Sequence, residues 1–226
     1  MKRKIVIKKP EYEITEDVVK LTVYSKKGKA IVTIFDRADL EKVQTITSWY
    51  AQWDKDFDNY LVLSKTLKES NGKKIALKDV LPATILEVSP NAPIHHINGD
   101  ILDNRKSNLK LYDRNQKNEF TQLDNQVIAI KLKNRYGYVV AETLISNEDL
   151  DHVVNENYTW IQQKRSNGQP IVIANTEEGR IILARHLMNC PTDSYVYHIN
   201  KNPLDNRRQN LEIKQLETDD AVLSES

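Results

Sequence analysis

Two segments of the chain carry the side chains best suited to chemistry, and each begins with a histidine. Residues 96–109 read HINGDILDNRKSNL and residues 198–211 read HINKNPLDNRRQNL, in identical register at an offset of 102 residues. Histidine titrates near neutral pH, and the asparagine and aspartate residues around it are turn formers whose side chains bond to nearby backbone. A repeat at about half the chain length indicates tandem duplication of a domain rather than a solenoid, whose units have roughly 20–50 residues.

The elements that position these segments also recur. Each copy contains an alternating apolar run, a short segment with apolar residues at helical spacing, a tryptophan, and a second apolar run. Alternation predicts a strand and the helical spacing predicts a helix. In chain order, the first copy offers residues 29–34, 38–43, Trp53 and 60–63, and the second offers 136–140, 148–153, Trp160 and 170–173. The sequence therefore predicts an α+β fold in which a strand-helix-strand segment precedes each histidine motif, with both tryptophans as core anchors.

The length of 226 residues exceeds the usual size of one domain and accommodates two modules of about 100 residues. We expect a first repeat with a basic N-terminal arm over residues 1–120, a second repeat over residues 121–216, and an acidic tail over residues 217–226. The seam is expected near residues 118–125. Loops absorb the difference in length between the two copies at small entropic cost.

Composition excludes several classes of protein. No run of 18 apolar residues could cross a bilayer, and the basic N-terminus lacks the long apolar segment of a secretion signal. A single cysteine, Cys190, cannot form an internal disulfide or a four-cysteine zinc site, which fits a reducing cytoplasm. The net charge of +1 is low for a protein whose whole surface binds nucleic acid, so any basic footprint must be local.

The repeated motif resembles the HNH, or ββα-metal, nucleases, and most of all those of phage homing endonucleases. The resemblance covers nearly all of residues 135–216 and, more loosely, the first half. It implies two antiparallel strands and a following helix that hold a divalent ion, Mg²⁺ or Mn²⁺, against duplex DNA. It also implies that His96 and His198 act as general bases and that Asn108 and Asn210 tie the turn and orient the histidine.

Both copies depart from the metal ligands of that family. The residue before the histidine is usually aspartate; here it is His95, a possible ligand, or Tyr197, a poor one for a hard cation. The second ligand, on the helix after the motif, would fall at Lys117, with Asn118 one residue further, or at Asp219. Neither copy has a complete conventional site, and the two copies have lost different ligands.

Basic residues gather at the N-terminus and after each turn. Phosphate contact is the favoured interpretation of the set after the turns, and a solvated surface is the alternative. Phosphate contacts fix register and do not specify sequence. The expected DNA-binding residues are Lys2, Arg3, Lys4, Arg105, Lys106, Lys110, Arg114, Lys117, Arg207 and Arg208.

Two hypotheses of different classes remain. The first is a double-stranded DNA-binding protein, a possible transcriptional regulator, whose halves act as a covalent pseudo-dimer on a two-half-site target while cleavage is weak or lost. The second is an active metal-dependent endonuclease that cuts or nicks through His96, with His95 and Asn118 on the ion. A weaker third is a protein-interaction module that uses the acidic tail. The DNA-binding hypotheses place the chain in the cytoplasm of a bacterial or phage-infected cell, on the nucleoid and away from membranes.

Overall fold

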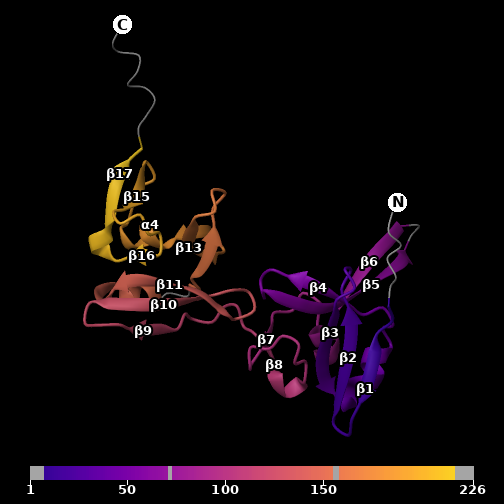
Figure 1. The fold of residues 1–226 in the computed structure, drawn as a ribbon. Coiled ribbons are helices and arrows are strands. Elements are labelled where there is room, and N and C mark those ends of the chain that lie inside the picture. The colour runs from indigo at the N-terminus through magenta and orange to yellow at the C-terminus, as the bar shows by residue number, and fades with distance from the viewer. Residues whose placement is uncertain (1–7, 71–72, 155–157, 217–226) are drawn as a thin grey trace. The chain divides into compact units, whose positions relative to one another are not determined.

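The computed structural model describes residues 8–70, 73–154 and 158–216, and the chain forms two compact units, Met1–Tyr112 and Asp113–Ser226. Strands dominate both units, and short helices connect several small sheets (Figure 1). The expectation of a mixed α+β fold is therefore confirmed. The residues from Asp113 to Phe120, which we expected in the first repeat, belong to the second unit.

The first unit consists of an antiparallel meander, a short helical segment, a three-stranded sheet, a second helix and a hairpin. In chain order its elements are β1 (Glu11–Ile14), β2 (Val18–Tyr24), β3 (Ala30–Asp36), η1 (Arg37–Asp39), α1 (Leu40–Gln44), β4 (Tyr50–Asp54), β5 (Asn59–Ser70), β6 (Lys73–Val80), α2 (Leu81–Leu86), β7 (Ile94–His96), η2 (Lys106–Asn108) and β8 (Leu109–Leu111).

The second unit repeats this order. Its elements are β9 (Phe120–Gln122), β10 (Val127–Lys133), β11 (Val139–Ser146), η3 (Asn147–Asp149), α3 (Leu150–Val154), β12 (Ile161–Lys164), β13 (Pro170–Thr176), β14 (Gly179–Ile182), α4 (Leu183–Leu187), β15 (Ser194–His198), β16 (Asp205–Asn206), η4 (Arg208–Asn210) and β17 (Leu211–Gln215).

A parallel contact closes each unit on itself. The second half of the histidine motif lies beside the last strand of the meander, as the β11–β16 pair in the second unit and as a bridge between Ile34 and Asp103 in the first. In the first unit the main chain of Ile34 donates to Leu102 and accepts from Asn104, at 2.9 and 2.7 Å. The motif at the end of each unit is thus fixed to a strand near its beginning.

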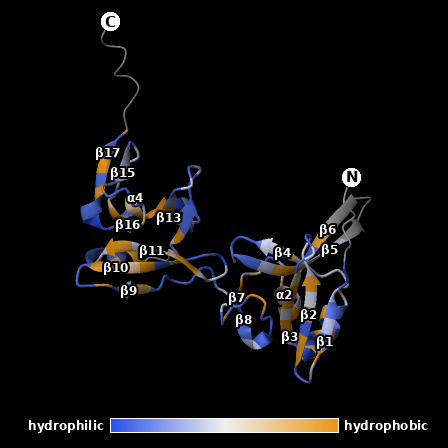
Figure 2. Cartoon of the chain, viewed as in Figure 1, coloured by the Kyte–Doolittle hydropathy of each residue, from blue (hydrophilic) through white to orange (hydrophobic). Residues whose placement is uncertain are grey.

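Alternation explains the meander strands. Val19, Leu21 and Val23 of β2 are fully buried, while Lys20 between them is exposed. Apolar residues at every second position give one buried face, and burial of such side chains drives folding at about 25 cal/mol per Å² of apolar surface. Figure 2 shows the apolar residues concentrated in the strands of both units.

The expectation that both Trp53 and Trp160 are core residues is confirmed for Trp160 and wrong for Trp53. Trp160 is fully buried in the second core, where its indole Nε1 donates to the main-chain oxygen of Val153 at 3.0 Å. Trp53 is 51% exposed on β4. Trp49 takes the buried position in the first core and donates to the oxygen of Val43 at 2.9 Å. The pairing of Trp53 with Trp160 was therefore wrong, because Trp49 lies directly before β4, as Trp160 lies before β12.

Two further expectations need correction. The segment 136–140 was expected as a strand, but its first residues form the turn between β10 and β11, where Gly137 has φ of +87°, and β11 begins at Val139. The helix expected after each hairpin is absent after β8, since residues 112–119 contain no helix and lead to β9. This segment is polar and lacks the apolar spacing that a helix needs to pack against a core. The equivalent segment after β17 lies outside the described residues.

Candidate nucleic-acid interface

The first histidine motif is a hydrogen-bonded network rather than an open loop. Nε2 of His96 lies 3.2 Å from Oδ1 of Asn104, and Nδ2 of Asn104 donates to Oγ1 of Thr33 at 2.8 Å. The Thr33 hydroxyl donates to the main-chain oxygen of Leu102 at 2.6 Å. Because the Asn104 amide nitrogen is the donor to Thr33, its oxygen must accept from His96. The Nε2 atom of His96 therefore carries the proton.

The second motif repeats the network atom for atom. Nε2 of His198 lies 3.1 Å from Oδ1 of Asn206, whose Nδ2 donates to Oγ1 of Thr143 at 2.8 Å. The Thr143 hydroxyl donates to the main-chain oxygen of Leu204 at 2.8 Å. His198 therefore has the same tautomer as His96. Asn104 and Asn206 are the partners of the two histidines, and sequence reasoning treated them only as turn formers.

The asparagine later in each motif closes the turn. Oδ1 of Asn108 accepts from the main-chain nitrogen of Asn98 at 2.8 Å, and its Nδ2 donates to the main-chain oxygen of Asp103 at 2.7 Å. Asn210 makes the equivalent bonds to Asn200 and Asp205, at 2.9 and 2.7 Å. All polar atoms of both amides are thus directed into the loop, where the structure gives them a positioning role.

The arginine after each turn is held by a buried aspartate. Arg105 donates from Nε and Nη2 to the two carboxylate oxygens of Asp103, at 2.8 and 2.6 Å. Arg207 forms the same fork with Asp205, at 2.7 Å for both bonds. Such bidentate pairs fix the orientation of the guanidinium. The arginine side chains remain 41% and 28% exposed.

The next basic residue of each motif pairs with an aspartate of the helical segment. Nζ of Lys106 lies 2.7 Å from Oδ1 of Asp39, and Nη2 of Arg208 lies 2.7 Å from Oδ1 of Asp149. Both aspartates are buried. These four positive charges of the two motifs therefore stabilise carboxylates within their own unit, a use that sequence reasoning did not foresee.

The electrostatics of the two motifs agree. Burial lowers the pKa of His96 and of His198 below the ordinary histidine value. The hydrogen bond from Arg105 is the main reason that the pKa of Asp103 lies below its ordinary value, and Arg207 acts in the same way on Asp205. At neutral pH each motif thus combines a neutral imidazole with a charged arginine–aspartate fork.

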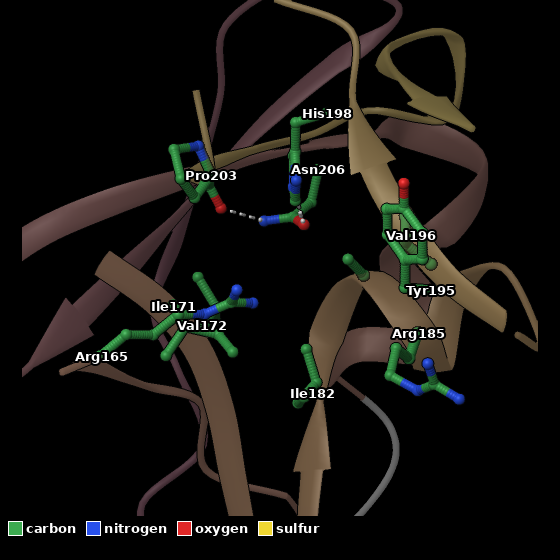
Figure 3. Close-up of a pocket in the computed structure, with 11 residues that line it drawn as sticks. Arg165, Ile171, Val172, Ile182, Arg185, Tyr195, Val196, His198, Pro203 and Asn206 are labelled. Atoms are coloured by element: carbon green, nitrogen blue, oxygen red, sulfur yellow. Dashed lines mark hydrogen bonds between the residues drawn. The ribbon is translucent and has the colours of Figure 1, made fainter. Parts of the chain in front are cut away.

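The two histidines differ in access. His96 is 2% exposed, and Ile101 of the same motif belongs to a small buried apolar cluster. His198 is half-buried and lines a pocket of about 180 Å³, into which Arg165 also points (Figure 3). Pro203 lines this pocket at the position that Ile101 occupies in the first motif, and it fills less space.

The described residues do not assemble the expected metal ligands. No group of three histidine, cysteine, aspartate or glutamate side chains that could hold an ion occurs among them. Asn118 belongs to the second unit, where its amide bonds to the main chain of Lys131 and Trp160, whereas His95 and His96 belong to the first. Asp219 lies outside the described residues. The Mg²⁺ or Mn²⁺ site stays a prediction.

The remaining expected DNA contacts fall into two groups. Lys110, Arg114 and Lys117 are exposed; the first is on β8 and the other two precede β9. The other group, Lys2, Arg3 and Lys4, lies outside the described residues.

Within the described residues no helix is long and apolar enough to cross a membrane. Comparisons of the chain with protein families, with curated proteins and with solved structures found no match.

Proposed function

We propose that the chain binds double-stranded DNA as a covalent pair of related units, each contacting one half of a two-part target, and that efficient strand cleavage has been lost. The observation that carries the proposal is the recurrence of one fixed guanidinium, that of Arg105 or Arg207, at the same place in both units. The proposal keeps the resemblance to phage homing nucleases as an account of ancestry. A transcriptional regulator is one role that fits such a protein.

The geometry of the fork suits phosphate contact. A guanidinium has five N–H donors, and the fork to Asp103 or Asp205 uses two of them. The other donors remain on a partly exposed side chain whose rotamer is already fixed. Less conformational entropy is lost when such a group binds, which favours affinity. Lys110, Arg114 and Lys117 add exposed positive charge that can neutralise phosphates.

Three features support the loss of cleavage. Both histidines are tied into internal networks, His96 is almost inaccessible, and the helix that would carry a second ligand is missing after β8. A general base must reach the proton that it abstracts, directly or through one water. The burial of His96, which is 2% exposed, therefore supports the loss of cleavage in the first unit.

A charge-neutral double substitution tests the DNA contact. Asp103→Asn/Arg105→Gln and Asp205→Asn/Arg207→Gln each remove a fork without changing net charge or leaving a buried carboxylate unpaired. The control is Glu13→Gln/Lys20→Gln, which removes an exposed ion pair of the first unit at 3.1 Å. Duplexes selected from a random pool by the full chain would then be titrated with each variant by fluorescence anisotropy.

We expect each fork variant to bind the selected duplex about tenfold more weakly. The slope of the logarithm of the binding constant against the logarithm of the salt concentration should fall in magnitude by about one, which corresponds to one lost phosphate contact. The control should bind as the natural chain does. The selected sequences should contain two half-sites, as a palindrome or a direct repeat, with centres about one helical turn apart. Selection of no duplex, or unchanged affinity in both fork variants with intact folding, would refute the proposal.

Endonuclease activity is the second candidate, and one observation favours the second unit for it. His198 lines a pocket, and its hydrogen bond to Asn206 leaves the lone pair of the neutral ring on Nδ1. Supercoiled plasmid incubated with the protein and Mg²⁺ or Mn²⁺ distinguishes the two candidates. Nicking that disappears in His198→Ala or His96→Ala would show that cleavage is retained; absence of nicking together with tight binding supports the first proposal.

A further inference from the structure

The first unit has a second basic surface, which the histidine motif does not include. A groove of about 460 Å³ lies between the start of β1, the β2–β3 turn, the segment before β4, and β5. Its size falls in the range of roughly 300–1,000 Å³ that is typical of small-ligand sites. Four lysines and two tyrosines among its lining residues carry the argument: Lys8, Lys9, Lys26, Lys65, Tyr24 and Tyr50.

The lysines of this groove are not neutralised internally. Among the described residues no carboxylate forms an ion pair with any of the four ammonium groups, in contrast to the arginines of the two forks. Glu11 is nearby, but its Oε1 accepts a hydrogen bond from the Tyr24 hydroxyl at 2.6 Å. Lys65 also lies directly opposite Lys78 on β6, a like-charge pair that destabilises a sheet. This concentration of unpaired positive charge is complementary to a polyanion.

The two tyrosines of the groove indicate which class of polyanion it would bind. Tyr24 and Tyr50 are both partly exposed, and Nζ of Lys8 lies 4.7 Å above the Tyr24 ring. Aromatic rings in a basic groove are typical of sites for single strands, because unpaired bases stack on the rings while the ammonium groups contact phosphates. A duplex keeps its bases stacked inside and could not use the tyrosines in this way.

In the second unit, hydrogen bonds connect the segments that are equivalent to the borders of this groove. In strand register Asn118 stands where the first unit has Pro10, and its side chain bonds to both the nitrogen and the oxygen of Trp160, at 2.7 and 2.8 Å. Thr159 adds a bond to the main-chain oxygen of Gln116 at 3.0 Å. Pro10 has no side-chain amide with which to make these contacts. The open groove is therefore a feature of the first unit and not a consequence of the shared fold.

Residues that line the groove of the first unit are also replaced at the equivalent positions of the second unit. The register places Lys133 where the first unit has Tyr24, and Asn175 where it has Lys65. Lys133 pairs with Glu119 at 2.6 Å and so contributes to the internal structure. The second unit thus lacks both the aromatic wall and the unpaired lysine.

From these observations we propose that the groove binds single-stranded nucleic acid, with phosphates on Lys8, Lys9, Lys26 and Lys65 and one base stacked on Tyr50. This activity is distinct from the duplex binding proposed above and does not depend on it. It would let one chain hold an unpaired strand next to a duplex target.

The test compares two charge reversals of equal size in the full chain. Lys26→Glu/Lys65→Glu alters the groove, and Arg135→Glu/Arg180→Glu changes the net charge equally on exposed positions of the second unit. Binding of a fluorescein-labelled twelve-residue oligothymidine would be measured by anisotropy, with a polyglutamate peptide as competitor. Thermal unfolding checks that each variant is folded.

We expect the groove variant to bind the oligothymidine at least tenfold more weakly, because it replaces two of the four proposed phosphate contacts by negative charges, and we expect the control to change by less than twofold. Tyr50→Leu should also weaken binding, whereas Tyr50→Phe should retain it. No binding of the oligothymidine, an equal loss in both charge variants, or displacement by polyglutamate at equal charge concentration would overturn the proposal, the last in favour of an acidic-peptide site. Selected duplex serves as a second probe: unchanged duplex affinity in the groove variant separates this site from the forks.

Discussion

Replacement of Thr143 by valine tests whether the network under the second histidine holds its unit together. The hydroxyl of Thr143 accepts from Asn206 and donates to Leu204, both at 2.8 Å, and Thr143 and Asn206 are fully or almost fully buried. Valine has nearly the same shape and no hydroxyl. The substitution therefore removes two hydrogen bonds and leaves the buried Asn206 amide without its short acceptor, whereas the Leu204 oxygen keeps its bond from the main-chain nitrogen of Leu144 at 2.8 Å.

The expected loss is about 2–4 kcal/mol of unfolding free energy. Each lost hydrogen bond costs about 1 kcal/mol net, and an unsatisfied buried group costs about 1–3 kcal/mol. Burial of the added methyl group returns about 0.8 kcal/mol. Thr33→Val removes the equivalent bonds of the first unit, at 2.6 and 2.8 Å, and should cost about the same.

Urea unfolding followed by tryptophan fluorescence measures these losses. Trp160 lies in the core of the second unit and Trp49 in that of the first, so each variant should destabilise the transition of its own unit. Thr22→Val, on the half-buried face of β2, is the control and should change stability by less than about 0.5 kcal/mol. A loss below about 1 kcal/mol for Thr143→Val, within the range of a single net hydrogen bond, would refute the view that the network holds the motif in place.

Three further predictions follow from the packing, the backbone and the protonation of the motifs. Trp160→Phe should cost about 2–3 kcal/mol in urea unfolding, since it leaves a cavity and a lost bond, whereas Trp53→Phe at an exposed position should cost less than about 0.5 kcal/mol. Lys201 has φ of +61° where the first motif has Gly99 at +79°; Lys201→Gly should therefore raise the melting temperature through about 1 kcal/mol of relieved strain, and Gly99→Ala should lower it. The folded-state pKa of His198 is lowered by burial, so the unfolded chain binds more protons as pH falls below about 6.5; stability should fall from there down to the folded pKa, and His198→Gln should flatten this part of a pH–stability curve.

The strands were predictable because their signal is local. The alternation of Val19, Leu21 and Val23 with polar neighbours sets one buried face, and the same holds for β10. The core tryptophan of the first unit was misassigned to Trp53, because the spacing alone does not show which of two neighbouring tryptophans faces the core. Trp49 and Trp53 both follow the helical segment and differ only in register.

The sequence located the two repeated motifs but not the contacts that their side chains make. The repeated spacing located both motifs, but the partner of each histidine, Asn104 or Asn206, was hidden among residues that suit any turn. The carboxylates that hold Lys106 and Arg208 are distant in sequence, 67 positions in the first unit and 59 in the second. Pairings of this kind follow from tertiary packing, so counts of local charge overstated the positive charge that is left without a carboxylate partner. The one clue in the sequence was the recurrence of Asp39 and Asp149 at equivalent positions.

The closure of each unit by its last segment has a consequence for how a duplicated chain reaches its native state. The terminal hairpin of either copy carries an asparagine, Asn104 or Asn206, that bonds to a threonine, Thr33 or Thr143, at the equivalent position of an early strand. During synthesis the first copy can complete its own pairing before the second emerges, but refolding from denaturant allows strand exchange between copies, a known failure of repeated domains. Correct pairing during refolding then depends on the positions at which the copies diverge, among them Ile101 against Pro203.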